Sequence, residues 1–595
     1  MPRFLSSLLL VLSASPAFAG AFVFGDSSVE QGNLYARPGY ERPGTPYYHR
    51  DGFSREANGP VWIEHLAPGI MPDAGARRGS RLVNFAYSGA TSGDDNIAGP
   101  VKNTGFNAQI NAFKTRGLRG EKGDFFAVAI GTNDFIRDLL GQRDLRKTSK
   151  EVIGNVSHGL GRLSALGAQR LLVEDIPNLQ EAPAFAHLVP PEDEDRFDTV
   201  MTKLLDQHRA AQLAALRTQN AQLKTTDIVT VKVSKLFDYV LDHAKELGFK
   251  TVTKACYDED SKTLCSKDRA VQNSYLFFDG LHLTEAGQRI QADYYRALTD
   301  QLDGSAHALP QALAGFALDR ENQLAASARD QRFSSWSGPI APEGFGVSAA
   351  AGSGSDDTRF GGLGIDWSDG TDWTARLDVT RDTAKVGGFS GESDIVGWST
   401  VVSGERRFGD MRIGASVGTL TGDAEGTRRM PVAHMSADHN TDLTGHFAEL
   451  SAGTVVAQGG LTLLPAAWLR WSDLEVGGFS ERGETGLEMA FDDITTSGLT
   501  GGVGLDLRVQ ASDRITPWAS ISYEDRLAGF DGTLTGRLIE NSADDIRRKL
   551  HLGEGLGQLR AGVDIGIADG GLLQLSGFLT SEESAGVKTR LSWRF

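Results

Sequence analysis

Two short turns carry side chains that together could perform nucleophilic catalysis. Ser27 follows the apolar run of residues 22–24 in a Gly-Asp-Ser turn, and Asp279 and His282 lie three residues apart in a later turn. A serine hydroxyl is a weak nucleophile that needs a histidine base and a group that orients this base. At this spacing a carboxylate can hold one imidazole nitrogen while the other nitrogen faces the serine. Ser27 is therefore our candidate nucleophile, and His282 is its candidate base.

Two further blocks contain groups suited to stabilising an oxyanion. Gly89 lies in residues 84–92, where an apolar run ends in small residues, and Asn133 lies just past the apolar run 125–130. A glycine lets the backbone approach a ligand closely. An asparagine NH₂ can donate to the negative charge that develops on a carbonyl oxygen. Gly89 and Asn133 are therefore candidates for the same site as Ser27.

The elements that would position these residues alternate between strands and helices from residue 20 to about residue 303. We expect strands at residues 22–24, 82–86, 125–130, 171–174 and 228–233, and helices at residues 107–114, 149–166 and 195–219. Such alternation indicates βαβ units and a parallel, doubly wound sheet. Ligands usually bind at the carboxyl ends of the strands of such a sheet, which is where Ser27 would lie.

The four blocks together resemble the GDSL, or SGNH, hydrolase family of esterases and lipases over about residues 21–303. The resemblance implies a three-layer α/β/α, flavodoxin-like hydrolase domain at residues 20–303 that needs no cofactor and no metal. It also implies that Ser27 attacks an ester carbonyl, that His282 takes and returns the proton, and that Asp279 orients the imidazole.

The resemblance further implies an oxyanion hole made by the backbone N–H groups of Ser27 and Gly89 and by the side chain of Asn133. One departure from the family pattern is Ser28, which stands where the family name has Leu. Because Ser28 neighbours the nucleophile, we expect it to alter the acyl pocket without removing the triad.

Composition limits the protein class and the environment. A chain of 595 residues is expected to form two or more domains, and a net charge of −17 argues against a nucleic-acid partner. Its two cysteines, Cys256 and Cys265, would close a small disulfide loop in an exported protein and would be free thiols in a cytosolic one. A zinc site is not expected, because two further suitably spaced ligands are not apparent.

The N-terminus indicates export. Residues 1–19 begin with Pro2-Arg3, continue with an apolar run at residues 8–12 and end in Ala-Phe-Ala, the pattern of a signal peptide with its cleavage site. The apolar run is too short to span a bilayer, and no other segment approaches the roughly 20 apolar residues of a membrane helix.

The second half of the chain, residues 344–595, has the alternation of a transmembrane barrel. In residues 373–380 Trp, Ala, Leu and Val alternate with Thr, Arg, Asp and Thr, and about twelve such segments are separated by Gly, Asp and Ser turns. A soluble sandwich would also alternate, but one face here is densely charged, as a water-filled lumen permits. Tryptophans near segment ends suggest an interfacial girdle: Trp373, Trp398, Trp468, Trp471, Trp518 and Trp593.

The order of the parts resembles an autotransporter: a signal peptide, a passenger, a linker at residues 304–343 and a C-terminal barrel. Pro310 would open a helix at residues 311–331 that, by this resemblance, runs through the barrel lumen. The polar segment 423–443 is expected to be a loop. A G-x-S-x-G match at residues 414–418 lies inside an alternating strand and therefore lacks the strand-turn-helix setting of a nucleophile elbow.

The preferred functional prediction is a serine carboxylesterase that acts on fatty-acyl or related esters. Its barrel would contact outer-membrane lipid, would need the barrel-assembly machinery by family resemblance, and would hold the hydrolase at the cell surface. Two alternatives stay open: removal of acetyl groups from a surface polysaccharide, and an adhesin-type passenger whose site is vestigial.

Overall fold

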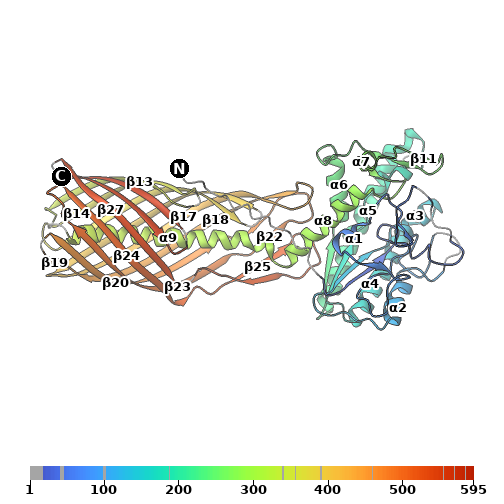
Figure 1. Cartoon of the computed structure of the whole chain (residues 1–595), viewed down its shortest axis with the longest axis horizontal. Coiled ribbons are helices and arrows are strands. Elements are labelled where there is room, and N and C mark those ends of the chain that lie inside the picture. Colours follow the sequence, from blue (N-terminus) through green and yellow to red (C-terminus); the bar gives the residue numbers. More distant parts are fainter. Residues whose placement is uncertain are drawn as a thin grey trace.

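The computed structural model consists of an α/β domain at one end and a long barrel with a helix along its axis (Figure 1). It describes residues 18–40, 44, 46–97, 102–185, 188–337, 341–355, 357–388, 391–458, 460–553, 555–568, 570–582 and 584–595. The predicted signal peptide, residues 1–19, lies almost wholly outside the described residues.

The α/β domain is built on a parallel sheet of six strands in the order β4-β5-β1-β6-β7-β8. These strands are β1 (Ala21–Gly25), β4 (Met71–Pro72), β5 (Leu82–Asn84), β6 (Phe125–Ala129), β7 (Arg170–Glu174) and β8 (Asp227–Val231). Along β1, Phe22 and Phe24 enter one buried cluster while Ala21 and Val23 enter the other. A strand buried on both faces requires helices on both sides of the sheet, and this confirms the predicted doubly wound α/β domain.

Helices and short strand pairs complete the α/β domain. The helices are α1 (Trp62–Leu66), α2 (Phe106–Thr115), α3 (Thr132–Leu140), α4 (Leu145–Ala165), α5 (Glu194–Gln222), α6 (Val233–Asp242), α7 (Arg269–Gln272) and α8 (Glu285–Leu302). The short pairs are β2 (His49–Arg50) with β3 (Phe53–Ser54), β9 (Thr251–Ala255) with β12 (Tyr275–Phe277), and β10 (Tyr257–Asp258) with β11 (Thr263–Leu264). The chain passes from β1 to β4 and β5 on one side of β1 and then to β6 on the other side, so the strand order reverses at β1. At such a reversal, a ligand usually binds at the carboxyl ends of the strands.

Within the described residues, the second half forms a 12-strand antiparallel barrel, closed by pairing of β18 with β20. Its strands are β13 (Gly344–Ser353), β14 (Arg359–Ser368), β15 (Trp373–Gly388), β16 (Gly391–Phe408), β17 (Met411–Arg429), β18 (Ser436–Thr454), β20 (Leu461–Val476), β23 (Ile494–Val509), β24 (Ile515–Gly529), β27 (Leu556–Ala568), β28 (Gly571–Thr580) and β29 (Ala585–Arg594). On β15 Leu377 and Val379 are exposed, whereas Arg376 pairs with Asp378 at 2.7 Å on the alternate face. This is the predicted pattern of apolar exterior and polar lumen.

Two expectations for the barrel are wrong. Residues 423–443 are not a loop, because β17 runs to Arg429 and β18 starts at Ser436. Trp468 and Trp518 are buried and donate their indole N–H groups to Glu524 and Asp564, so both face the lumen rather than the lipid girdle. The remaining tryptophans of that prediction are at least one-third exposed: Trp373, Trp398, Trp471 and Trp593.

A 30-residue helix, α9 (Ala308–Ser337), follows the short turn η4 (Ser305–His307) and runs along the barrel axis (Figure 1). Its charged side chains pair with the barrel wall: Arg320 Nη2 lies 2.5 Å from Asp382 Oδ1, and Arg332 Nη2 lies 3.1 Å from Glu449 Oε1. Buried charges are tolerated when they are paired in this way. No helix among the described residues has both the length and the apolar character needed to cross a membrane.

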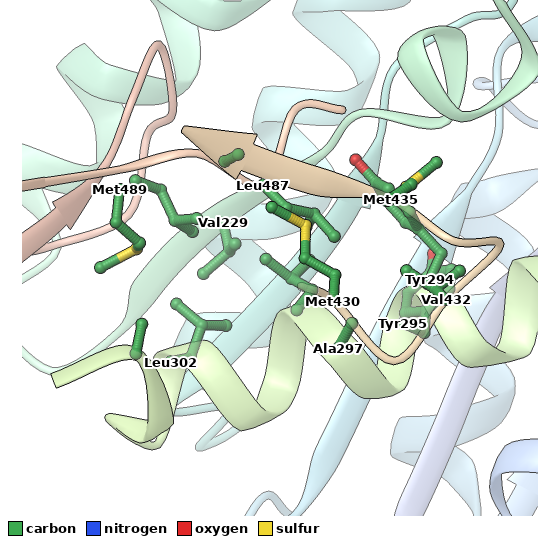
Figure 2. Packing of buried hydrophobic residues seen from close by; sticks show 14 of the residues in the cluster. Val229, Tyr294, Tyr295, Ala297, Leu302, Met430, Val432, Met435, Leu487 and Met489 are labelled. Carbon is green, nitrogen blue, oxygen red and sulfur yellow. The ribbon is translucent and has the colours of Figure 1, made fainter. Parts of the chain in front are cut away.

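The barrel strands extend to the α/β domain and share a buried core with it. Figure 2 shows Met435 beside Tyr294 and Tyr295 of α8, while Met489 lies nearer the end of this helix at Leu302, and all these side chains are buried. A small sheet of β21 (Phe479–Ser480), β22 (Met489–Phe491), β25 (Thr533–Leu538) and β26 (Ile546–Lys549) lies at this junction. The α/β domain is thereby held against the barrel by apolar burial and not by the helix alone.

Hydrogen bonds at the junction cover the outer edge of the parallel sheet. Asn541 Oδ1 accepts from the Thr230 N–H at 3.0 Å, and Asn541 Nδ2 donates to the Thr230 carbonyl at 2.8 Å. Thr230 lies on β8, the last strand of the sheet. The side chain of Asn541 therefore satisfies backbone groups that an exposed edge strand would leave open.

Candidate active site

Ser27 lies in the turn that follows β1, and this turn is fixed on both sides. Gly25 exchanges two hydrogen bonds of 2.8 Å with the side chain of Gln109 on α2. Asp26 Oδ1 accepts from the Ser28 N–H at 3.1 Å. The strand and these bonds bring the half-buried Ser27 to the carboxyl edge of the sheet, beside the strand crossover.

Asp279 and His282 lie between β12 and α8, and their side chains meet. His282 Nδ1 is 2.8 Å from Asp279 Oδ2. Asp279 Oδ1 also accepts from the His282 N–H at 2.7 Å, which closes the turn around the carboxylate. Thr284 is the N-cap residue of α8, but its hydroxyl donates to the Tyr275 carbonyl instead of accepting from the helix.

The N–H groups proposed to bind the oxyanion are available to a ligand. Within the described part of the chain, the backbone N–H groups of Ser27 and Gly89 have no hydrogen-bond acceptor. Gly89 has φ +72°, a conformation that favours glycine. Asn133 Nδ2 donates to the Ala90 carbonyl at 3.0 Å, which orients the amide and leaves its second hydrogen for a ligand.

A cavity of about 130 Å³ brings Ser27, Asn133 and His282 into one space. Its walls include apolar side chains: Ile136, Leu179, Phe237, Phe277, Leu281 and Leu283. The carboxyl group of Glu174 is also in the lining, and it accepts from Tyr295 and Gln291 at 2.9 Å each. Burial raises the pKa of Glu174 to about 8, so this acid is mostly protonated at neutral pH.

Sequence reasoning missed Glu56, a residue of the loop between β3 and α1. Its Oε2 lies 3.1 Å from His282 Nε2, the nitrogen expected to face Ser27. The carboxylate also accepts from Ser88 Oγ at 2.8 Å and from the Tyr35 hydroxyl. No strand or helix periodicity marks Glu56 in the sequence, so only its tertiary contacts identify it.

The two carboxylates shift the pKa of His282. Burial lowers this pKa, but Asp279 and Glu56 outweigh burial and raise it well above its usual value. Conversely, burial raises the pKa of Glu56, while His282 and the hydroxyl donors outweigh it and lower the pKa to about 2. Asp26 behaves differently, because burial raises its pKa to about 6. Both carboxylates therefore favour the protonated form of the imidazole.

Cys256 and Cys265 form a disulfide beside the turn that carries Asp279 and His282. Buried Cys256 packs with Phe278, the residue before Asp279. The Cys256 N–H donates to the Phe277 carbonyl at 3.1 Å. The disulfide therefore supports the chain that leads into Asp279 and His282.

Among the described residues, no cluster of three or more potential ligands could hold a metal ion.

The geometry predicts that Asn133→Ala lowers kcat by roughly 10²- to 10³-fold, because a preorganised donor to the oxyanion is lost. Steady-state kinetics of the purified full-length protein would measure the loss. Asn155→Ala is the matched control, because Asn155 Nδ2 donates to Ser92 Oγ and Asn155 does not line the cavity. A kcat within about threefold of the control would remove Asn133 from the oxyanion hole.

Comparison with known proteins finds a family match in each half of the chain. Residues 22–295 match the GDSL-like Lipase/Acylhydrolase family, and residues 343–577 match the Autotransporter beta-domain family. The second match places the barrel in the outer membrane and the passenger on the cell surface.

Individual relatives are distant. A GDSL esterase/lipase of Arabidopsis thaliana is 26% identical over 47% of this chain and 86% of its own length. A phosphatidylcholine-sterol acyltransferase of Aeromonas hydrophila is 25% identical over 41% of this chain and 66% of its own length. Among solved structures, the translocator domain of the autotransporter NalP from Neisseria meningitidis has a TM-score of 0.38 and 17% identity, covering 46% of this chain and 98% of that one.

Proposed function

We propose that this chain, a GDSL-family hydrolase joined to an autotransporter β-domain, is a surface-anchored serine carboxylesterase acting on fatty-acyl or related esters. The observation that carries the proposal is the shared cavity: Ser27, Asn133 and His282 line one space, and Asp279 holds the imidazole at 2.8 Å. A nucleophile, an oriented base and open oxyanion donors are the parts that acyl transfer requires.

In the proposed mechanism Ser27 Oγ attacks the ester carbonyl and its proton passes to His282 Nε2. The carbonyl oxygen becomes negatively charged, and the N–H groups of Ser27 and Gly89 together with the Asn133 amide stabilise it. The C–O bond to the alcohol breaks as His282 returns the proton to the leaving oxygen. Water, deprotonated by His282, then attacks the acyl carbon on Ser27. The bond from this carbon to Ser27 Oγ breaks, His282 returns the proton to Oγ, and the carboxylic acid is released.

The cavity walls and one relative support the proposed substrate class. Ile136, Leu179 and Phe237 offer an apolar surface beside Ser27, and an acyl chain would bury its methylenes there. The acyltransferase of Aeromonas hydrophila bears a name that refers to an acyl ester of a phospholipid. Both points favour an acyl group longer than acetyl.

The test combines active-site labelling with an acyl-length series on intact cells. We expect a fluorophosphonate to label Ser27, mapped by mass spectrometry, and we expect aryl esters of medium or long acyl chains to be hydrolysed faster than the acetyl ester. Ser27→Ala should abolish the label. Preference for an acetylated glycan would favour the deacetylase alternative, and absence of both label and turnover would favour an adhesin.

A further inference from the structure

The contact between Glu56 and His282 conflicts with simple triad geometry. In a working triad His282 Nε2 accepts the proton of Ser27, yet here Nε2 lies 3.1 Å from Glu56 Oε2. Within the described residues, Ser27 Oγ makes no hydrogen bond. An ionised carboxylate cannot donate to Nε2, so its approach to 3.1 Å is favourable only when Nε2 carries a proton.

Glu56 is held at this position independently of the histidine. Arg55, the preceding residue, makes a bidentate ion pair with Glu64 at 2.6 and 2.9 Å, and both side chains are almost fully buried. Asn58 Oδ1 accepts from the Glu285 N–H at 2.7 Å and so ties the same loop to the start of α8. The carboxylate itself accepts from Ser88, which precedes Gly89.

Resting on the proposed function, we propose that Glu56 is a positioning residue that keeps His282 protonated and turned from Ser27 in the free enzyme, so that the esterase works only above a pH set by this contact. When His282 loses the Nε2 proton, its lone pair faces the carboxylate and the two repel. The imidazole is then free to accept the hydrogen of Ser27.

Other charged or titratable groups surround His282, and the test must distinguish their effects on its titration from the effect of Glu56. They are Asp279 in the same turn, Asp26 beside the nucleophile, Glu259 inside the loop that the disulfide closes, and the hydroxyls of Tyr35 and Tyr47. Of the carboxylates, Glu56 and Asp279 contact the imidazole directly. Glu259 accepts from Tyr47 at 3.0 Å and is exposed, which makes it a matched charge control.

The experiment measures kcat/KM against pH, because this ratio reports the pKa values of groups in the free enzyme. We expect Glu56→Gln to move the midpoint of the acidic limb to lower pH by about one unit or more. At a pH below both midpoints, the variant should then have a kcat/KM about tenfold higher, relative to its own plateau, than the wild type. Glu56→Asp keeps the charge and should stay nearer the wild-type midpoint. Glu259→Gln removes a more distant charge and should move the midpoint less than Glu56→Gln does.

Fluorophosphonate labelling of Ser27 supplies a second readout. Its rate constant against pH is independent of the fraction of folded protein, and it should show the same shift in Glu56→Gln. A midpoint shift in Glu56→Gln no larger than the shift in Glu259→Gln would overturn this inference alone. Failure of the wild type to label Ser27 at any pH would overturn the proposed function and this inference with it.

Discussion

Ser27→Ala is expected to lower kcat for ester hydrolysis by roughly 10⁶-fold, close to complete loss. The variant removes the only atom that can form the acyl-enzyme in the proposed mechanism. The oxyanion donors stay in place, because the Ser27 and Gly89 N–H groups belong to the backbone and the Ala90 carbonyl holds Asn133. Residual turnover would therefore come from direct attack of water on a bound ester.

The measurement uses the full-length protein in detergent, with outer-membrane fractionation to verify that each variant assembles. Ser416→Ala is the matched control. Ser416 is the serine of the second nucleophile-like motif, but it is buried inside β17 of the barrel. Its replacement should leave hydrolysis unchanged. Normal activity in Ser27→Ala, or a phosphonate label on Ser416, would contradict the assignment of the nucleophile.

The sequence could predict the turns that carry Ser27, Asp279 and His282 because each turn is determined locally. An apolar run buried on both sides gives a strand, and the polar turn after it lies at the carboxyl edge. The Asp279–His282 contact also forms within one turn, over three residues. Asn133 follows the same rule as Ser27, since it comes at the start of α3 directly after β6.

Glu56 could not be predicted, because its position depends on residues far away in the chain. Ser88 and Tyr35 hold its carboxylate, and Arg55 anchors its loop through Glu64. None of these pairs follows a period of 2 or 3.6 residues. A short polar loop offers no hydrophobic pattern, so nothing in the sequence distinguishes Glu56 from solvated glutamates.

The errors in the barrel have separate causes. Trp468 and Trp518 lie on the charged faces of their strands, with Arg470 and Glu524 respectively, and a tryptophan near a segment end belongs to a lipid girdle only when it lies on the apolar face. In residues 423–443 the strands continue toward the α/β domain, where a polar sequence is compatible with a strand. Ala424 and Ala437 lie buried there against the shared core, which a polar composition conceals.

Asp279→Asn is expected to lower kcat by about 10⁴-fold, because the amide stabilises the wrong imidazole tautomer. Asp279 Oδ1 accepts from the N–H groups of Leu281 and His282, and the amide oxygen can keep these bonds. The new NH₂ then replaces Oδ2 and faces His282 Nδ1. It donates to Nδ1 and leaves the only ring proton on Nε2, where Ser27 needs an acceptor.

The pH profile separates this loss from the effect of Glu56. Both Asp279→Asn and Glu56→Gln remove an anion that raises the pKa of His282, so both should move the acidic limb of kcat/KM to lower pH. Only Asp279→Asn should also lose about 10⁴-fold in the plateau, because only it reverses the tautomer. Glu259→Gln controls for the charge near Tyr47. A plateau in Asp279→Asn within about tenfold of this control would mean that His282 is oriented by some group other than Asp279.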